Sequence, residues 1–381
     1  MSQKIKVAIL SVSAGAGHVR AAQALERVIA DNYSDVEAVH LDVMDYVPKL
    51  FRKLYAESYV YVINRYPALW GYMYDKSDQV RKESSLIKKI RVAIERLNTK
   101  KLLSKMIELK PDVIISTHFL PPELISRMIR KGASLPPSWV QVTDFDLHGL
   151  WVHDFMTGYF AASDEVAFRM RNRGIPEDRI TVTGIPIMPS FRKRYSRTEC
   201  ASEIGVDPEK FTILLMAGGL GVGGVFELTE HLMKMEKDFQ VISLAGKNTN
   251  LLSELKKLSE KYPERLFPIG FTKTIERVMA VSDLAVTKPG GLTSSECLAV
   301  GLPMIVIAPI PGQEERNSDY LLENGTAVKA NDPIGVEYKI RELLGDPDRL
   351  RRMSENALKI SRPDAAERVL EKVIKDISED Q

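Results

Sequence analysis

Short runs of β-branched and aliphatic residues alternate with helical patterns along most of the chain, and this alternation constrains the fold more than any other feature. It is typical of parallel sheets built from strand–helix–strand units. The predicted strands form two sets, with a polar segment at 189–208 between them as the expected linker. The first set is 7–11, 36–42, 113–116, 139–143, 158–161 and 180–183; the second is 212–216, 240–244, 266–269, 284–287 and 303–307. A chain of 381 residues is long enough for two such domains.

The first strand of each set runs into a glycine-rich turn, SAGAG at 13–17 and AGGLGVGG at 217–224. Such a turn lets backbone N–H groups and a helix N-terminus approach an anionic group. A tight structural turn explains each one alone nearly as well, but their matching places favour two Rossmann-like domains that face each other across a cleft. Neither turn is a complete dinucleotide fingerprint, and the absence of a GxxxxGK[ST] motif disfavours a P-loop nucleotidase.

Composition sets several protein classes aside. The formal net charge of +2 gives no reason to expect nucleic acid as a partner. Cys200 and Cys297 lie far apart, so neither a disulfide framework nor a zinc site is indicated. No signal-peptide pattern is found, and no window approaches the ~20 apolar residues that span a membrane. We therefore expect a cytoplasmic protein whose contact with membranes is peripheral.

The segment 45–101 departs from the strand–helix rhythm. It begins with a helical stripe of aromatic and aliphatic residues, and nine basic residues against three acidic ones follow between Lys76 and Lys101. A basic amphipathic stretch rich in aromatics suits an interface with anionic lipid headgroups. An inserted helical hairpin that packs its tyrosines on the first domain explains the stripe equally well, so both interpretations stay open.

The stretch VTKPGGLTSSECLAVGLPMIVI, at 286–307, places a turn and a helix after a buried strand. Thr293, Ser294 and Ser295 are candidate N-caps, which would put Glu296 in the first turn of the helix. A carboxylate there can accept two hydrogen bonds from a ribose diol. It can equally stabilise the helix dipole. The residues alone leave these two roles open.

Polar side chains also follow the next strand, in PIPGQEERN at 309–317. Gln313, Glu314 and Asn317 cluster where open α/β sheets bind ligands, and they could bracket sugar hydroxyls. Taken alone, the cluster is better explained as a solvated loop and the start of a helix.

Two metal-site patterns occur in VTDFDLHGLWVH, at 142–153. Asp144 and Asp146 form a DxD pair, with which some glycosyltransferases hold a divalent metal, and His148 and His153 could be zinc ligands. A bare DxD arises often by chance, and the H-x4-H spacing lacks further ligands. We therefore expect no metal site.

Five motifs, in this order, resemble the monogalactosyldiacylglycerol synthases and bacterial diacylglycerol glucosyltransferases, which belong with the MurG-like glycosyltransferases: GAGHVRAAQAL, VTDF-LH--WVH, VTGIPI, KPGGLTSSE and PIPGQEERN. The resemblance runs from residue 7 to about 324. It implies an α/β fold of the GT-B type, with an acceptor-binding domain at 1–190 that carries the insert 45–101. A UDP-sugar-binding domain at 191–362 follows, and a C-terminal helix at 363–381 returns to the first domain.

The resemblance also implies an inverting, metal-independent transfer of a hexose from a UDP-sugar to the hydroxyl of 1,2-diacylglycerol, with no further cofactor. It assigns catalysis to His18, as general base, and to Asp144. On the donor side, Glu296 would hold the ribose and Phe271 would lie by the uracil. The full donor set is Gly218, Gly219, Gly221, Phe271, Gly290, Gly291, Thr293, Glu296, Gln313, Glu314 and Asn317, and the acceptor side comprises Gly17, His148 and Trp151.

The histidine suits a base because its ordinary pKa lies near the working pH without extreme tuning. Plant relatives carry DTGGGH where this chain has SAGAGH, so Ser13 stands in the place of an aspartate. Asp144 or another carboxylate would then have to orient His18, or the histidine works alone.

Two other functions keep the same architecture: transfer to a polyprenyl-linked acceptor, and a UDP-sugar epimerase or sensor. The VTDF-LH--WVH pattern speaks against the first. Glucose is favoured over galactose because the whole-chain resemblance is nearer to the bacterial branch. The expected partners are a UDP-hexose and diacylglycerol in an anionic membrane surface, with the protein on the inner face of the cell membrane.

Overall fold

The computed structural model describes residues 4–13, 15–48, 100–216 and 224–379, and the chain forms two compact units. The first unit comprises Met1–Pro189, Ile310–Arg316 and Pro363–Gln381, and the second Ser190–Pro309 and Asn317–Arg362. The sequence had placed the boundaries after residues 190 and 362. Most of the predicted insert, at 49–99, and the predicted donor glycines Gly218, Gly219 and Gly221 lie outside the described residues.

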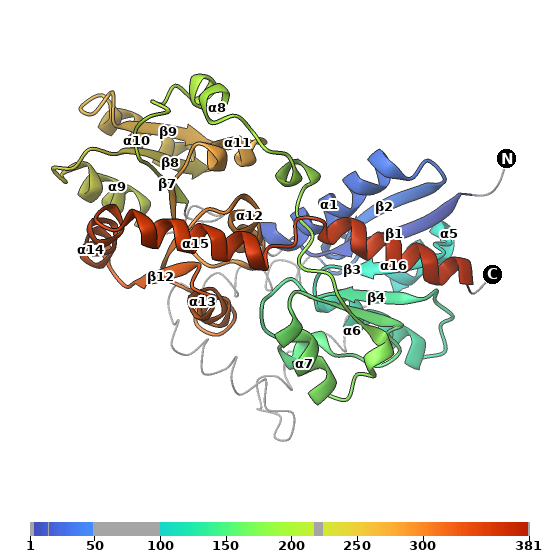
Figure 1. The fold of residues 1–381 in the computed structure, drawn as a ribbon. Helices are drawn as coiled ribbons and strands as arrows, with labels where there is room; N and C mark the ends of the chain where they lie inside the picture. Colours follow the sequence, from blue (N-terminus) through green and yellow to red (C-terminus); the bar gives the residue numbers. More distant parts are fainter. Residues whose placement is uncertain (1–3, 14, 49–99, 217–223, 380–381) are drawn as a thin grey trace. The chain divides into compact units, whose positions relative to one another are not determined.

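The first unit is built on a six-stranded parallel sheet in the order β2-β1-β3-β4-β5-β6 (Figure 1). Its strands are β1 (Ile5–Ser11), β2 (Val36–Asp42), β3 (Val113–Ser116), β4 (Ser138–Gln141), β5 (Gly158–Ala161) and β6 (Ile180–Val182). The helices between them are α1 (Ala16–Asn32), α5 (Lys100–Leu109), α6 (Leu120–Arg130) and α7 (Asp164–Asn172), with 3-10 turns η1 (Val43–Asp45), η2 (Gly149–Trp151) and η3 (Glu177–Arg179). All six strands had been predicted from their apolar runs.

The C-terminal helix α16 (Ala365–Glu379), red in Figure 1, packs in the core of this first unit. Its buried residues recur at helical spacing and lie in one cluster with β1 and α1: Ala366, Val369, Leu370, Val373 and Ile377. Burial of this apolar stripe explains why the last helix of the chain belongs to the unit that the first strand starts.

The second unit has its own parallel sheet, in the order β12-β11-β10-β7-β8-β9. Its strands are β7 (Thr212–Met216), β8 (Gln240–Gly246), β9 (Leu266–Gly270), β10 (Leu284–Thr287), β11 (Met304–Ile307) and β12 (Ala327–Ala330). Strand β12 was not predicted, because an edge strand of sequence AVKA has no apolar run. The helices are α8 (Arg197–Ile204), α9 (Val225–Met233), α10 (Thr249–Ser259), α11 (Ile275–Ala280), α12 (Gly291–Val300), α14 (Pro333–Leu344) and α15 (Pro347–Ile360). Helix α13 (Gln313–Glu323) begins in the part of the chain assigned to the first unit and continues from Asn317 in the second.

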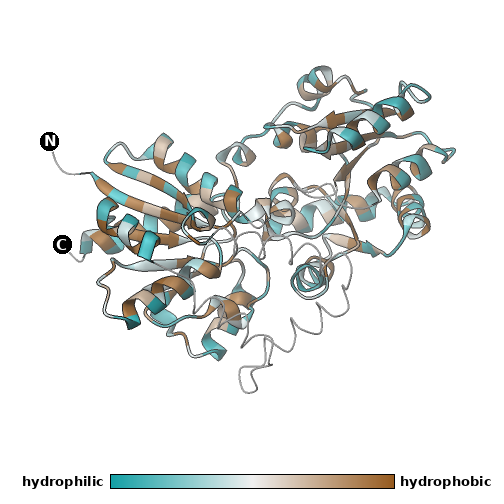
Figure 2. Ribbon diagram, turned by 180° about the vertical axis from the view of Figure 1, so that it is seen from behind, coloured by the Kyte–Doolittle hydropathy of each residue, from teal (hydrophilic) through white to brown (hydrophobic). Residues whose placement is uncertain are grey.

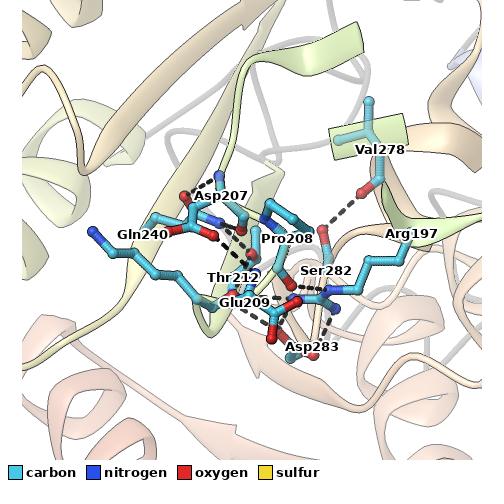
Figure 3. Close-up of polar contacts among 10 residues, drawn as sticks. Arg197, Asp207, Pro208, Glu209, Thr212, Gln240, Val278, Ser282 and Asp283 are labelled. Carbon is cyan, nitrogen blue, oxygen red and sulfur yellow. Dashed lines mark hydrogen bonds and ion pairs between the residues drawn. The ribbon is translucent and has the colours of Figure 1, made fainter. Parts of the chain in front are cut away.

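The predicted linker at 189–208 is more ordered than its polar composition indicated, since it contains the turn η4 (Pro189–Arg192) and helix α8. The guanidinium of Arg197, the first residue of α8, donates two hydrogen bonds of 2.9 Å to the Asp283 carboxylate (Figure 3). It also donates to the carbonyl of Pro208, and Asp283 accepts from the backbone N–H of Thr212 at 2.7 Å. This bidentate pair ties α8 to the start of the second sheet.

Hydrophobic residues lie along the strands of each sheet, whereas the helices have both hydrophobic and hydrophilic sides (Figure 2). In both sheets the chain reverses its direction of travel beside the first strand, between β1 and β3 and between β7 and β10. Open α/β sheets bind ligands at such switch points, outside the carboxyl ends of the strands. The residues that come directly after these strands in the sequence are therefore candidates for ligand binding.

Candidate functional site

His18 lies beside the switch point of the first sheet. Helix α1 begins after Gly15, whose φ of 107° favours glycine, so Gly17 and His18 fall in its first turn. The Nδ1 atom of His18 lies 3.0 Å from the carbonyl oxygen of Thr117, which follows β3, and 2.9 Å from the hydroxyl of Thr143, which follows β4. Three neighbouring strands thus converge on one imidazole.

These contacts define the tautomer of His18. A carbonyl oxygen can only accept, so Nδ1 carries the proton and the lone pair is on Nε2. Nε2 has no hydrogen-bond partner within the described ranges. Burial lowers the pKa of His18 to about 4, although its hydrogen bond to Thr117 opposes the shift. The imidazole is therefore neutral at physiological pH, and its pKa lies further from the working pH than the sequence analysis expected.

Aromatic side chains surround this imidazole. The ring of His118 contacts that of His18, with centroids 4.4 Å apart, and Trp151 lies 6.3 Å away. Phe119 lies edge-on to Trp151 at 6.0 Å. Trp151 is one of the predicted acceptor-side residues, whereas His118 is not among the residues predicted from the sequence. The signal for it was a histidine two positions after the strand VIIS, at the carboxyl edge where His18 also lies.

The VTDF segment reaches His18 through Thr143. Asp144 is half-buried, and a direct catalytic role for it stays a prediction. His148 is buried and caps η2, where its Nδ1 accepts a hydrogen bond of 3.1 Å from the backbone N–H of Leu150. This capping gives His148 a structural role next to Trp151.

The residues of the two metal-site patterns contact other protein groups. The buried carboxylate of Asp146 pairs with Arg169 at 3.0 Å and with Arg316. The Nδ1 atom of His153 lies 3.1 Å from the Glu123 carboxylate. Among the residues that the structure describes, no three His, Cys, Asp or Glu side chains are grouped to hold a metal ion.

In the second unit, α12 begins earlier than predicted. Gly290 is its N-cap, so Thr293, Ser294 and Ser295 lie inside the helix and their prediction as N-caps was wrong. Gly290 has an extended backbone conformation after the turn that follows β10, and the helix begins at the next residue. Glu296 consequently lies in the second turn and is only 7% exposed. Because dipole effects fade beyond the first turn, stabilisation of the helix dipole does not account for this carboxylate.

Gly290 itself faces open space. Its φ of −65° suits any residue, and a Cβ built on it would meet no atom of the described residues within 4 Å. Gly291, which opens the helix, is buried. Packing among the residues that the structure describes therefore does not require glycine at 290, whereas close approach of a ligand to the backbone would.

Phe271 presents an aromatic face at the carboxyl edge of the second sheet. It follows β9 directly and is 61% exposed, and the Nζ of Lys247, which follows β8, lies 5.5 Å from its ring centroid. An exposed phenylalanine of this kind can stack on a planar base.

The side chains of PGQEERN lie around the start of α13. Gln313 and Glu314 are half-buried, and the Glu314 carboxylate accepts a hydrogen bond of 2.7 Å from the backbone N–H of Ile310. Asn317, also predicted to bind the donor, is fully buried, so its side chain is not open to a ligand as placed. Glu314 thus stabilises this turn, in addition to any contact that it makes with a sugar.

None of the described helices combines the length and apolarity needed to cross a bilayer.

Comparisons with known proteins agree with this architecture. The family model for monogalactosyldiacylglycerol (MGDG) synthase matches residues 18–187, and that for glycosyl transferases group 1 matches 198–360. MurG from Acinetobacter baumannii has a similar fold, with a TM-score of 0.63 at 16% identity, covering 98% of this chain and 99% of that one. UDP-GlcNAc 2-epimerase from Neisseria meningitidis, solved with UDP-GlcNAc, has a TM-score of 0.60 at 14% identity, covering 98% and 100%.

The two parallel sheets and these neighbours define a two-domain α/β protein of the GT-B type. The processive diacylglycerol beta-glucosyltransferase of Bacillus subtilis (strain 168) is 30% identical over 380 residues, 99% of this chain and 96% of that protein. The chain therefore belongs to the family of monogalactosyldiacylglycerol synthases and processive diacylglycerol glucosyltransferases, and it is a glycosyltransferase.

Proposed function

We propose that this protein is an inverting glycosyltransferase that transfers a hexose, glucose in preference to galactose, from a UDP-sugar to the hydroxyl of 1,2-diacylglycerol. The observation that carries the chemistry is the state of His18, a neutral imidazole whose Nδ1–H is held by Thr117 and whose Nε2 lone pair can accept a proton. The similarity to diacylglycerol beta-glucosyltransferases supports the acceptor and the choice of glucose.

In the proposed reaction, Nε2 of His18 takes the proton of the acceptor hydroxyl as its oxygen attacks the anomeric carbon. The bond from that carbon to the diphosphate oxygen breaks, UDP leaves with the electron pair, and the configuration inverts. A base with a pKa of about 4 is weak. A bound diphosphate would raise that pKa, because a nearby negative charge favours the imidazolium.

The donor would bind to the second unit. Glu296 accepts hydrogen bonds from the ribose diol, and Phe271 stacks on the uracil. The backbone N–H groups of Gly291 and Thr293 would meet the diphosphate at the start of α12, whereas the N–H of Gly290 donates to the carbonyl of Lys288 at 3.0 Å. Their placement after β9 and β10, at the carboxyl edge of the sheet, supports this assignment. Gln313 and Glu314, in the segment 310–316 that belongs to the first unit, would contact the hexose.

Diacylglycerol resides in a bilayer, so we place the protein on the inner face of the cell membrane as a peripheral protein. The basic, aromatic segment 45–101 would supply the contact with anionic lipid. The proposed reaction uses no metal ion and no cofactor besides the sugar nucleotide.

Product analysis tests the proposal. Purified protein is incubated with diacylglycerol in anionic liposomes, with UDP-glucose or UDP-galactose and EDTA, and lipids are analysed by chromatography and mass spectrometry. We expect hexosyl-diacylglycerol with inverted anomeric configuration, formed faster from UDP-glucose. If folded protein binds UDP but yields no glycolipid from either donor, the proposal fails. Turnover with a polyprenyl-linked acceptor, or epimerisation of the sugar nucleotide without an acceptor, would then identify the alternative.

A further inference from the structure

A buried histidine, His118, lies against the proposed base. The ring planes of His18 and His118 meet at 80°, with centroids 4.4 Å apart. His118 is only 2% exposed and takes no part in the reaction proposed above. A buried ionisable ring in this place requires an explanation, because apolar side chains fill cores at lower desolvation cost.

The backbone holds His118 in one orientation. Its Nδ1 lies 3.0 Å from the backbone nitrogen of Leu120, the first residue of α6. An N–H group can only donate, so Nδ1 accepts and the proton of the neutral ring is on Nε2. The next two residues of the helix, Pro121 and Pro122, have no N–H, so Leu120 supplies the only backbone donor of the first three positions.

The residue before His118 contacts the same imidazole. The carbonyl of Thr117 accepts from Nδ1 of His18, and the Thr117 hydroxyl donates to the backbone carbonyl of His18 at 2.9 Å. The dipeptide that follows β3 therefore contacts His18 at its ring nitrogen, its backbone and its ring surface. These contacts together resist rotation of the imidazole about χ2, which would exchange Nδ1 with a carbon atom.

We propose that His118 is a positioning residue for His18: its ring, anchored to the N–H of Leu120, packs against the His18 imidazole and keeps Nδ1 on the Thr117 carbonyl and Nε2 available. The inference rests on the proposed role of His18 as the base. His118 itself moves no proton in the reaction. Burial and the neighbouring His18 hold the pKa of His118 well below its ordinary value, which keeps this ring neutral.

Two substitutions separate the features of His118. His118→Asn retains an acceptor for Leu120 but removes the ring, and His118→Phe retains a ring but removes the acceptor. We expect His118→Asn to lower kcat about ten-fold through misorientation of the base, with KM for UDP-glucose and the Kd of UDP unchanged. His118→Phe should retain more of kcat, because the ring contact persists.

The direct readout is the tautomer of His18, measured by long-range ¹H–¹⁵N correlation on protein labelled with ¹⁵N-histidine and assigned with His18→Gln. We expect Nδ1-protonated His18 in the wild type and a tautomer mixture in His118→Asn. His231→Asn, in the second unit, is the matched control and should change neither readout. His118→Asn that keeps the single tautomer and the wild-type kcat overturns the proposal.

If His118→Asn does not fold, the His18 tautomer in His118→Phe tests the proposal instead. A single His18 tautomer in that variant supports the ring contact, and a mixture in natively folded protein contradicts it. The tautomer is observed without turnover, so failure of the proposed function, seen as absent glycolipid in the wild type, is distinguishable from failure of this inference.

Discussion

At the scale of single residues, the proposed chemistry depends on one imidazole kept neutral by burial and oriented by backbone and hydroxyl groups. Thr117 and Thr143 supply the recorded contacts to Nδ1 of His18. Ser13, in the place of the aspartate of plant relatives, is exposed, and its N–H donates to the Asp42 carboxylate at 3.3 Å. Among the described residues, the partners of Nδ1 are thus neutral oxygen atoms of Thr117 and Thr143.

Removal of the proposed base should abolish turnover without affecting the nucleotide. We expect His18→Ala to lower kcat by ~10²–10⁴. UDP should bind with unchanged affinity, since its proposed contacts belong to the second unit. Glycolipid formation and calorimetric titration with UDP measure the two effects, with His231→Ala as a control. Near-normal turnover in His18→Ala would remove the residue from the base role.

Gly290→Ala should affect the ligand and leave the fold intact. An added Cβ meets no atom of the described residues and φ is ordinary, but alanine is a poorer N-cap than glycine. We therefore expect the free energy of unfolding to fall by no more than about 1 kcal/mol. UDP affinity should fall about ten-fold, or 1.4 kcal/mol, if the diphosphate approaches this backbone. Uridine, which lacks phosphates, is the control ligand and should bind both proteins alike. Equal UDP affinities would place the diphosphate elsewhere.

At the scale of elements, close packing of neighbouring strands governs the first sheet. Trp139 in β4 is buried and stacks on Phe160 of β5, with ring centroids 4.9 Å apart. A Cβ added to Gly158 in β5 would lie 2.1 Å from the Trp139 ring. The glycine is needed here because the indole occupies the place of a side chain.

Gly158→Ala should therefore destabilise the protein by about 1–3 kcal/mol, the usual effect of overpacking a core. Urea unfolding of the purified variants measures the change. In a Trp139→Leu background the same substitution should have a smaller effect, since the clashing ring is gone. Strict additivity of the two substitutions would show that the indole is not the cause.

At the scale of the whole molecule, the same arrangement occurs twice: each parallel sheet reverses its strand order beside its first strand. The proposed base follows β1, and the proposed donor residues Phe271 and Glu296 follow β9 and β10. A lipid acceptor adds a requirement that neither sheet meets, namely contact with a bilayer surface. The sequence of 45–101 is the basis of that prediction, and most of it lies outside the described residues.

Binding to liposomes should depend on charge. We expect co-sedimentation with anionic vesicles to exceed that with neutral vesicles at low salt and to weaken as salt rises, because screening shortens the reach of exposed charges. Lys88→Gln combined with Lys89→Gln should reduce the binding. The paired control, Lys256→Gln with Lys257→Gln on the exposed side of α10, should not. Equal binding to anionic and neutral vesicles at low salt would contradict the predicted electrostatic attraction to the membrane.

The local sequence determined the strands, the parallel class of both sheets, the C-terminal helix and the position of His18 at a strand-to-helix turn. These features follow from periodicity and turn residues that act over a few positions. Two features were not predicted from the sequence. Strand β12 lacks an apolar run, and the start of α12 at Gly290 was not recognised because Thr293, Ser294 and Ser295 are stronger N-cap candidates.

Only the tertiary structure decided which groups meet the imidazole. Thr117 and Thr143 are 99 and 125 residues from His18 in the chain, and they reach it because β3 and β4 follow β1 in the sheet order. Strand order is set by packing between distant segments, which no local pattern encodes. For the same reason the neighbour His118, the low pKa of His18 and the burial of Glu296 became apparent only in the folded chain.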